Sequence, residues 1–168
     1  TLFLPVIGAL LLLFIGKDNA KGIKSAALGF SLLTFVASVM LFFQFDSSNP
    51  DLQFVINNVW ISQFDAGFRI GIDGMSMLML LLTTFITPIA ILSSFDAIKK
   101  RHKEYYFMVL LLQFGMTGVF VALDLFLFYV FWELILIPMY FIIGIWGGKE
   151  RLYATVKFFL FTVVGSLF

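Results

Sequence analysis

The sequence predicts an all-α fold, a polytopic transmembrane bundle of about six helices with a short surface hairpin or loop between the second and third. Composition is the first observation behind this prediction. Of the 168 residues, 61% are hydrophobic and 12% charged, and the mean hydropathy is +1.04. A soluble domain covers its exterior with polar groups and does not reach such values. The second observation is that long apolar runs recur between short polar connectors, and about 20 apolar residues cross a hydrocarbon core of roughly 30 Å.

We predict a single membrane domain over residues 1–168, with spanning helices at approximately 2–16, 25–45, 73–95, 105–123, 124–146 and 152–168. The first apolar stretch is short and the chain opens without methionine, so a signal peptide is an alternative. No basic region precedes the stretch and no small-residue cleavage site follows it. We therefore interpret it as a spanning helix trimmed at its start, and the sixth helix as one that is cut short.

Residues 46–71 interrupt the helical pattern. Turn-forming residues occupy 47–50, including Pro50, and alternation of apolar and polar residues resumes at 54–57 and 68–72. This pattern is typical of short strands or an amphipathic segment. We expect a hairpin or loop at the membrane surface, outside the bilayer.

The connectors alternate in charge along the chain. Those after the first, third and fifth helices carry Lys17, Lys21 and Lys24, the run 99–103, and Lys149 with Arg151. Those after the second and fourth carry Asp46, Asp51, Asp65, Asp73 and Asp124 against Arg69. By the positive-inside rule, the basic connectors face the cytoplasm or matrix and the N-terminus lies outside, on the periplasmic side of a bacterial membrane.

Glu133 is the main candidate for a functional site. It follows Asp124, the expected N-cap of the fifth helix, by nine residues, which places it roughly 13 Å into the membrane, near the midplane. An ionised carboxylate there costs several kcal/mol unless it has a partner, water or a proton. Pro138 cannot donate to the carbonyl of Leu134, so a free acceptor and a kink are expected beside the acid. Together these features predict a proton path.

Lys157 and Gln113 are weaker candidates for the same path. Lys157 lies roughly 8 Å inside the sixth helix, where a lysine either extends its side chain back to the surface or joins the path. Its vertical separation from Glu133, roughly 11 Å, exceeds a salt bridge, so water or another group would have to fill the gap. Gln113 lies mid-span in the fourth helix, and an interhelical hydrogen bond is the stronger expectation for its amide.

Several classes of site are excluded by composition. The chain has no cysteine and therefore no disulfide, thiolate nucleophile or iron–sulfur cluster. A single histidine, His102, argues against a haem or a histidine-rich metal site. The net charge of +1 is spread over short loops, which argues against nucleic acid. We expect no cofactor, metal or catalytic residue in this chain, and redox chemistry must take place elsewhere.

Four segments resemble a known family. They are FWELILIPMYFIIGIWGG at 131–148, GIDGMS at 71–76, GVFVALD at 118–124 and YATVKFFLFTVVGS at 153–166. They are similar to the chain M family, the antiporter-like membrane subunits of proton-pumping NADH:quinone oxidoreductase, or respiratory complex I. The resemblance is specific from about residue 71 onward.

The resemblance implies a subunit of about fourteen helices, built on two inverted five-helix repeats with broken helices at their centres. Glu133 then matches the essential acid of the fifth helix, whose usual partner is a lysine on the seventh. The chain would be an N-terminal fragment, located in a bacterial plasma membrane or an equivalent energy-coupling membrane. Its partners would be the lipid bilayer and the other membrane subunits of complex I.

Three functional hypotheses follow. The leading one is a translocase subunit of complex I, in which electron transfer in other subunits drives proton movement through this one. The alternative is a subunit of a multi-component cation/proton antiporter or of a membrane-bound hydrogenase. A purely structural membrane anchor is the third, and it would tolerate neutralisation of Glu133.

Overall fold

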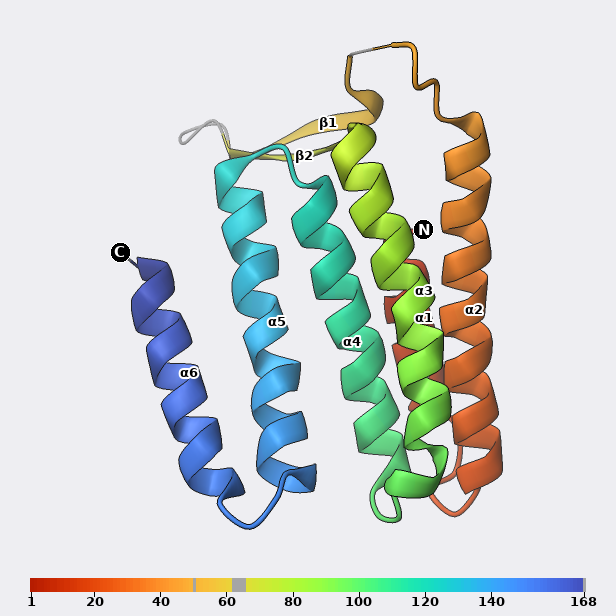
Figure 1. Cartoon of the computed structure of the whole chain (residues 1–168), viewed down its shortest axis with the longest axis vertical. Helices are drawn as coiled ribbons and strands as arrows, with labels where there is room; N and C mark the ends of the chain where they lie inside the picture. The colour runs from red at the N-terminus through yellow and green to blue at the C-terminus, as the bar shows by residue number, and fades with distance from the viewer. Residues whose placement is uncertain (50, 62–65, 168) are drawn as a thin grey trace.

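The computed structural model describes residues 1–49, 51–61 and 66–167. It contains six helices and one antiparallel hairpin, in the order α1 (Leu4–Leu12), α2 (Ala20–Gln44), β1 (Gln53–Ile61), β2 (Ala66–Ile72), α3 (Gly74–Ala97), α4 (His102–Val121), α5 (Leu125–Trp146) and α6 (Arg151–Leu167). The helices run up and down beside one another, with the hairpin at one end of the bundle (Figure 1). The predicted fold class is therefore confirmed. Pro50 and Asp65 of the predicted loop lie outside the described residues.

Four of the described helices, α2, α3, α4 and α5, are long and apolar enough to cross a membrane. The helix α1 has nine residues and is about 13 Å long. Beyond it the chain tightens into turns in which the N–H groups of Leu13 and Phe14 donate to carbonyls three residues back. The helix α2 begins at Ala20 rather than at residue 25, because the Asn19 side chain accepts from the N–H of Gly22 and caps it.

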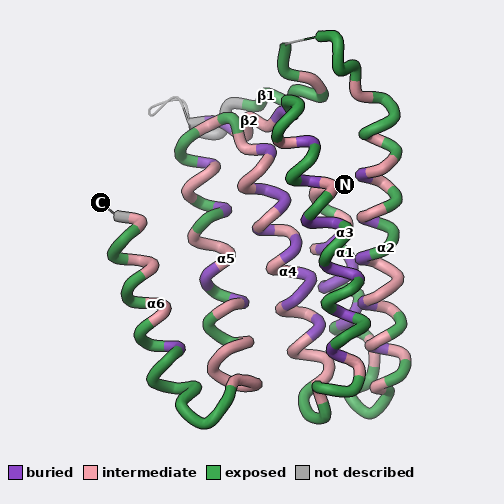
Figure 2. Tube along the Cα trace, viewed as in Figure 1, coloured by how far each residue is buried: buried purple, intermediate pink, exposed green. Residues whose placement is uncertain are grey.

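The core lies between α1, α2, α3 and α4. The helix α4 contacts the other three as well as α5, and buried residues concentrate on it and on the facing sides of its neighbours (Figure 2). One core cluster contains Ala9, Leu12, Ile23, Ala27, Ile91, Tyr106, Val109 and Leu110. The helix α6 packs against α5 at the edge of the bundle, and most of its length is exposed (Figure 2).

A seam of buried hydroxyl groups runs between α2 and α3. Its members, which we call the hydroxyl seam, are Ser31, Thr34, Ser38, Thr83, Thr84, Thr87 and Ser94. Each hydroxyl oxygen lies within hydrogen-bond distance of a backbone carbonyl of its own helix, three or four residues back. Ser94 also lies 3.1 Å from the hydroxyl of Tyr106 on α4. Between the two helices, the hydrogen bond recorded for the described seam residues joins Ser38 to Thr84 at 2.7 Å. Polar groups inside a bilayer must be satisfied within the protein, and the seam achieves this mostly helix by helix.

The hairpin is fixed to the α4–α5 connector. Ile70 of β2 forms an isolated antiparallel bridge with Ala122. The N–H of Leu123 donates to the carbonyl of Arg69 at 2.9 Å, and the N–H of Gly67 donates to the Asp124 carboxylate at 3.3 Å. The strands therefore lie against the end of the bundle where α5 begins (Figure 1).

Five charged side chains form hydrogen bonds with helix ends whose dipole has the opposite sign. At one end, Lys24, Lys103 and Arg151 donate to carbonyls at or just beyond the C-terminal ends of α3, α1 and α5, at 2.6–2.8 Å. At the other end, Asp73 and Asp124 accept from N–H groups that open α3 and α5. Basic groups thus lie at negative dipole ends and acidic groups at positive ones. Lys21 and Lys24 belong to the first turns of α2 rather than to the connector before it.

Candidate functional site

Glu133 lies near the middle of α5. The 22 residues of this helix span about 33 Å, and Glu133 lies about 13 Å along it from the capping residue Asp124. Asp124 caps the helix as predicted, because its carboxylate accepts from the N–H groups of Phe126 and Leu127. The side chain of Glu133 is half-buried. The structure therefore places a carboxyl group at mid-depth in one of the four helices able to span a membrane.

The carboxylate of Glu133 is held by α6. The hydroxyl of Ser166 lies 2.7 Å from Glu133 Oε1, and it also lies 2.9 Å from the backbone carbonyl of Val163. A cavity of about 390 Å³ opens between the two helices at this level. Its walls are formed by Phe128, Tyr129, Trp132, Phe161, Thr162, Gly165 and Ser166.

Ser166 is the functional candidate that sequence reasoning missed. It occurs in one of the four segments that carry the family resemblance, but nothing in that segment links it to Glu133. A signal was nevertheless available, because α5 and α6 are antiparallel neighbours. Glu133 lies 13 residues before Trp146 and Ser166 lies 15 residues after Arg151, so the two side chains reach nearly the same depth from the connector.

Pro138 is buried within α5, which continues without interruption on both sides of it. Proline has no N–H, so the carbonyl of Leu134, the residue next to Glu133, receives no hydrogen bond from position 138. A backbone acceptor therefore lies directly beside the acid along the chain.

Lys157 is not brought to Glu133. Its exposed ammonium group lies 3.3 Å from the hydroxyl of Tyr153 and 5.4 Å from the centre of the Tyr153 ring. Tyr153 lies one turn closer to the basic end of the bundle, so the lysine side chain extends toward that end. Ser166, which contacts Glu133, lies nine residues further along α6, about 13 Å away.

Gln113 is fully buried in α4 but lies away from Glu133. The side of α4 that meets α5 is formed by Gly115 and Gly118, which face Ile135 and Phe131. Gln113 belongs to the opposite side, with the core between α1, α2 and α3. Neither its amide nitrogen nor its amide oxygen has a hydrogen-bond partner among the described residues. The expected interhelical hydrogen bond is therefore absent from that part of the chain.

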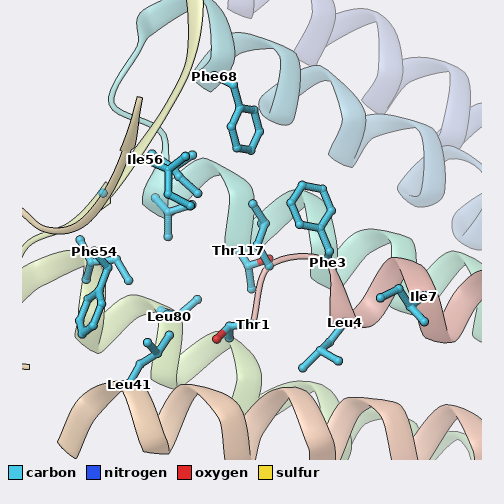
Figure 3. A pocket seen from close by; sticks show the side chains of 15 residues that line it. Thr1, Phe3, Leu4, Ile7, Leu41, Phe54, Ile56, Phe68, Leu80 and Thr117 are labelled. Atoms are coloured by element: carbon cyan, nitrogen blue, oxygen red, sulfur yellow. The ribbon is translucent and has the colours of Figure 1, made fainter. Parts of the chain in front are cut away.

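A second cavity, of about 350 Å³, lies beneath the hairpin (Figure 3). Phe3, Leu41, Phe54, Ile56, Phe68 and Leu80 are among the side chains that point into it. None of the described residues that line it has an ionisable side chain. Within residues 1–49, 51–61 and 66–167, no three histidine, cysteine, aspartate or glutamate side chains gather to form a metal site.

Two family models match consecutive parts of the chain. Residues 1–118 match the amino-terminal family of NADH-ubiquinone oxidoreductase chain 4. Residues 122–168, which include Glu133 and Ser166, match the transmembrane family of NADH:quinone oxidoreductase and Mrp antiporters.

Individual relatives agree with the family models. The chain is 44% identical over its whole length to NADH-quinone oxidoreductase subunit M of Rickettsia conorii and 45% identical over 98% of its length to NADH-ubiquinone oxidoreductase chain 4 of Arabidopsis thaliana. It spans about a third of each relative, 35% and 33% respectively. Its fold superposes on 32% of a chain of respiratory complex I from Thermus thermophilus with a TM-score of 0.83 and 28% identity, covering 99% of this chain. The chain is a multi-pass membrane protein that belongs to the NADH-ubiquinone oxidoreductase chain 4 family.

Proposed function

We propose that this chain is part of a proton-translocating membrane subunit of NADH:quinone oxidoreductase, respiratory complex I. Electron transfer takes place in other subunits, and this chain contributes an acid that takes up and releases protons inside the membrane. The family matches and the structural likeness to complex I support the assignment. Its partners are then the other membrane subunits of the complex and the lipid bilayer.

The observation that carries the proposal is the position of Glu133. A carboxylate at mid-depth in a spanning helix is expensive unless it is neutralised or well partnered. Among the described residues, its hydrogen-bond partner is the Ser166 hydroxyl. Such a carboxylate is poised to bind a proton when the site is closed to water and to release it when water or a cation approaches.

The orientation belongs to the same proposal. Lys24, Lys103 and Arg151 bond to carbonyls at or just beyond the C-terminal ends of α3, α1 and α5. The hairpin lies at the opposite end of the bundle (Figure 1). By the positive-inside rule, the basic end faces the cytoplasm of a bacterial cell or the equivalent compartment, and the hairpin faces outside. Glu133 then lies between the two aqueous phases, as a relay site must.

A subunit of a multi-component cation/proton antiporter is the second candidate. The family model that covers Glu133 and Ser166 describes both NADH:quinone oxidoreductases and Mrp antiporters. The two functions use the same acid but differ in what drives it. Proton uptake that stops when NADH oxidation is inhibited supports the first, and uptake driven by a sodium gradient without NADH supports the second.

The test is Glu133→Gln in the full-length protein, assembled in membrane vesicles. Glutamine is nearly isosteric, so packing and assembly should persist, while the proton-binding group is lost. We expect coupled proton uptake to fall by a factor on the order of 10², the usual contribution of a positioned proton-transfer group. Glu150→Gln, the same change in the exposed α5–α6 connector, is the matched control. Normal uptake by the Glu133 variant with normal complex content would leave the membrane-anchor hypothesis as the better one.

A further inference from the structure

The hydroxyl of Ser166 has two acceptors within reach but a single hydrogen. Its oxygen lies 2.7 Å from Glu133 Oε1 and 2.9 Å from the carbonyl oxygen of Val163. A serine hydroxyl donates one hydrogen bond and accepts up to two. At any moment the hydrogen therefore points mainly toward the carboxyl group of α5 or toward the backbone of α6.

The protonation state of Glu133 decides between these two directions. An ionised carboxylate only accepts, so the serine hydrogen turns toward it and forms a charge-assisted bond. A protonated carboxyl group has its own O–H to donate. The serine oxygen then accepts that hydrogen, and the serine hydrogen turns to the carbonyl of Val163. No covalent bond of Ser166 breaks, because the change is a rotation about its Cβ–Oγ bond.

We propose that Ser166 is a positioning residue whose hydroxyl rotates between Glu133 and Val163, so that both protonation states of Glu133 remain hydrogen-bonded. The inference rests on the proposed function of Glu133. It adds a residue on a second helix that forms a hydrogen bond with both the charged and the neutral form of Glu133. Without such a partner the charged form would lose more than the neutral one, since hydrogen bonds to ionised groups are roughly twice as strong.

The two threonine hydroxyl groups of α6 differ from that of Ser166. Thr155 donates to the carbonyl of Arg151 at 2.7 Å, and Thr162 donates to the carbonyl of Phe158 at 2.8 Å. For both, the recorded hydrogen bond is to the backbone of α6 itself. Thr162 also lines the same cavity as Ser166. Thr162→Val is therefore a matched control that removes a hydroxyl from the same helix and the same cavity.

The experiment follows the Glu133 carboxyl infrared band against pH in the assembled complex. Subtracting the spectrum of Glu133→Gln isolates this band. We expect Ser166→Ala to raise the midpoint of the titration by about one pH unit, a tenfold gain in proton affinity, because the charged form loses its donor. Ser166→Thr should restore the original midpoint, and Ser166→Cys, a weaker donor, should give an intermediate value.

Three results would overturn the inference. They are an unchanged midpoint in Ser166→Ala, an equal shift in Thr162→Val, and a shift that Ser166→Thr does not reverse. Should the alanine variant fail to assemble, the cysteine variant carries the same test. The outcome is distinguishable from failure of the proposed function. If Glu133→Gln abolishes proton uptake while the Ser166 variants titrate like the wild type, only the role of Ser166 is lost.

Discussion

Two polar side chains, one in the core formed by α1, α2, α3 and α4 and one at the contact between α5 and α6, have opposite surroundings. The core encloses Gln113, which is fully buried, uncharged and without a hydrogen-bond partner among the described residues. The α5–α6 contact holds Glu133, which is half-buried, ionisable and hydrogen-bonded to Ser166. Complete burial of a polar group is therefore not what suits it to proton transfer. Under the proposed function, a titrating site needs a partner, and the α5–α6 contact provides one in the hydroxyl of Ser166.

Placing an acid in the core should have the largest effect on stability. In Gln113→Glu the carboxyl group would enter a site where the described residues provide no partner. We expect a loss of several kcal/mol in stability above neutral pH, since an isolated buried charge is not compensated. Thermal unfolding of the detergent-solubilised protein at pH 6 and pH 9 measures the effect, with a larger loss at pH 9. Wild-type stability at both values would show that the core around position 113 is hydrated.

Gly118→Ala tests how much the close packing of α4 against α5 contributes to stability. A Cβ atom at position 118 would clash with the ring of Phe131, which is itself buried. The ring would have to move, so we expect a destabilisation of about 1–3 kcal/mol, the usual range for overpacking. The control is Gly29→Ala, because nothing lies within 4 Å of the added atom there and alanine favours a helix interior. Denaturant unfolding of both variants decides, and equal stability would show that α4 and α5 separate without loss.

The smallest expected effect comes from protonation of Asp124, which caps the helix that carries Glu133. Burial alone would raise the pKa of Asp124, but N–H donors from Leu127, Gly67 and Phe126, together with the charge of Arg69, lower it below the ordinary value. Its stabilising contribution is therefore full above the ordinary aspartate pKa and is lost as pH falls through the lowered value. We expect proteolysis of the hairpin to become slightly faster over that acidic range.

Asp124→Asn tests whether this pH dependence arises from Asp124. Asparagine still caps a helix, so the fold should persist, but the acid-dependent change in hairpin proteolysis should disappear. Asp18→Asn, at the opposite end of the bundle, should retain the wild-type pH dependence. A variant at position 124 that keeps the full acid response would show that another group holds the hairpin.

Depth along the membrane was predictable from the sequence, whereas rotation about each helix axis was not. Counting residues from Asp124 placed Glu133 at mid-depth, and the same counting would have matched Ser166 to it. The sides of α4 that carry Gln113 and Gly118 were not predictable, because a helix that is apolar all round gives no amphipathic signal to orient it. The start of α2 was missed for a related reason, since Lys21 and Lys24 resemble loop residues until the partner of Lys24, the carbonyl of Phe95, is known.

The hydroxyl seam has a mechanical consequence. Its side chains bond to carbonyls of their own helices, so these bonds travel with each helix when it moves. Among the described seam residues, Ser38 and Thr84 form the hydrogen bond that would have to break if α2 slid along α3. Side-chain hydrogen bonds between membrane helices average only about 0.6 kcal/mol. The seam therefore adds little resistance to sliding of α2 along α3, although the hydrogen bond from Lys24 of α2 to the carbonyl of Phe95 in α3 would also have to break.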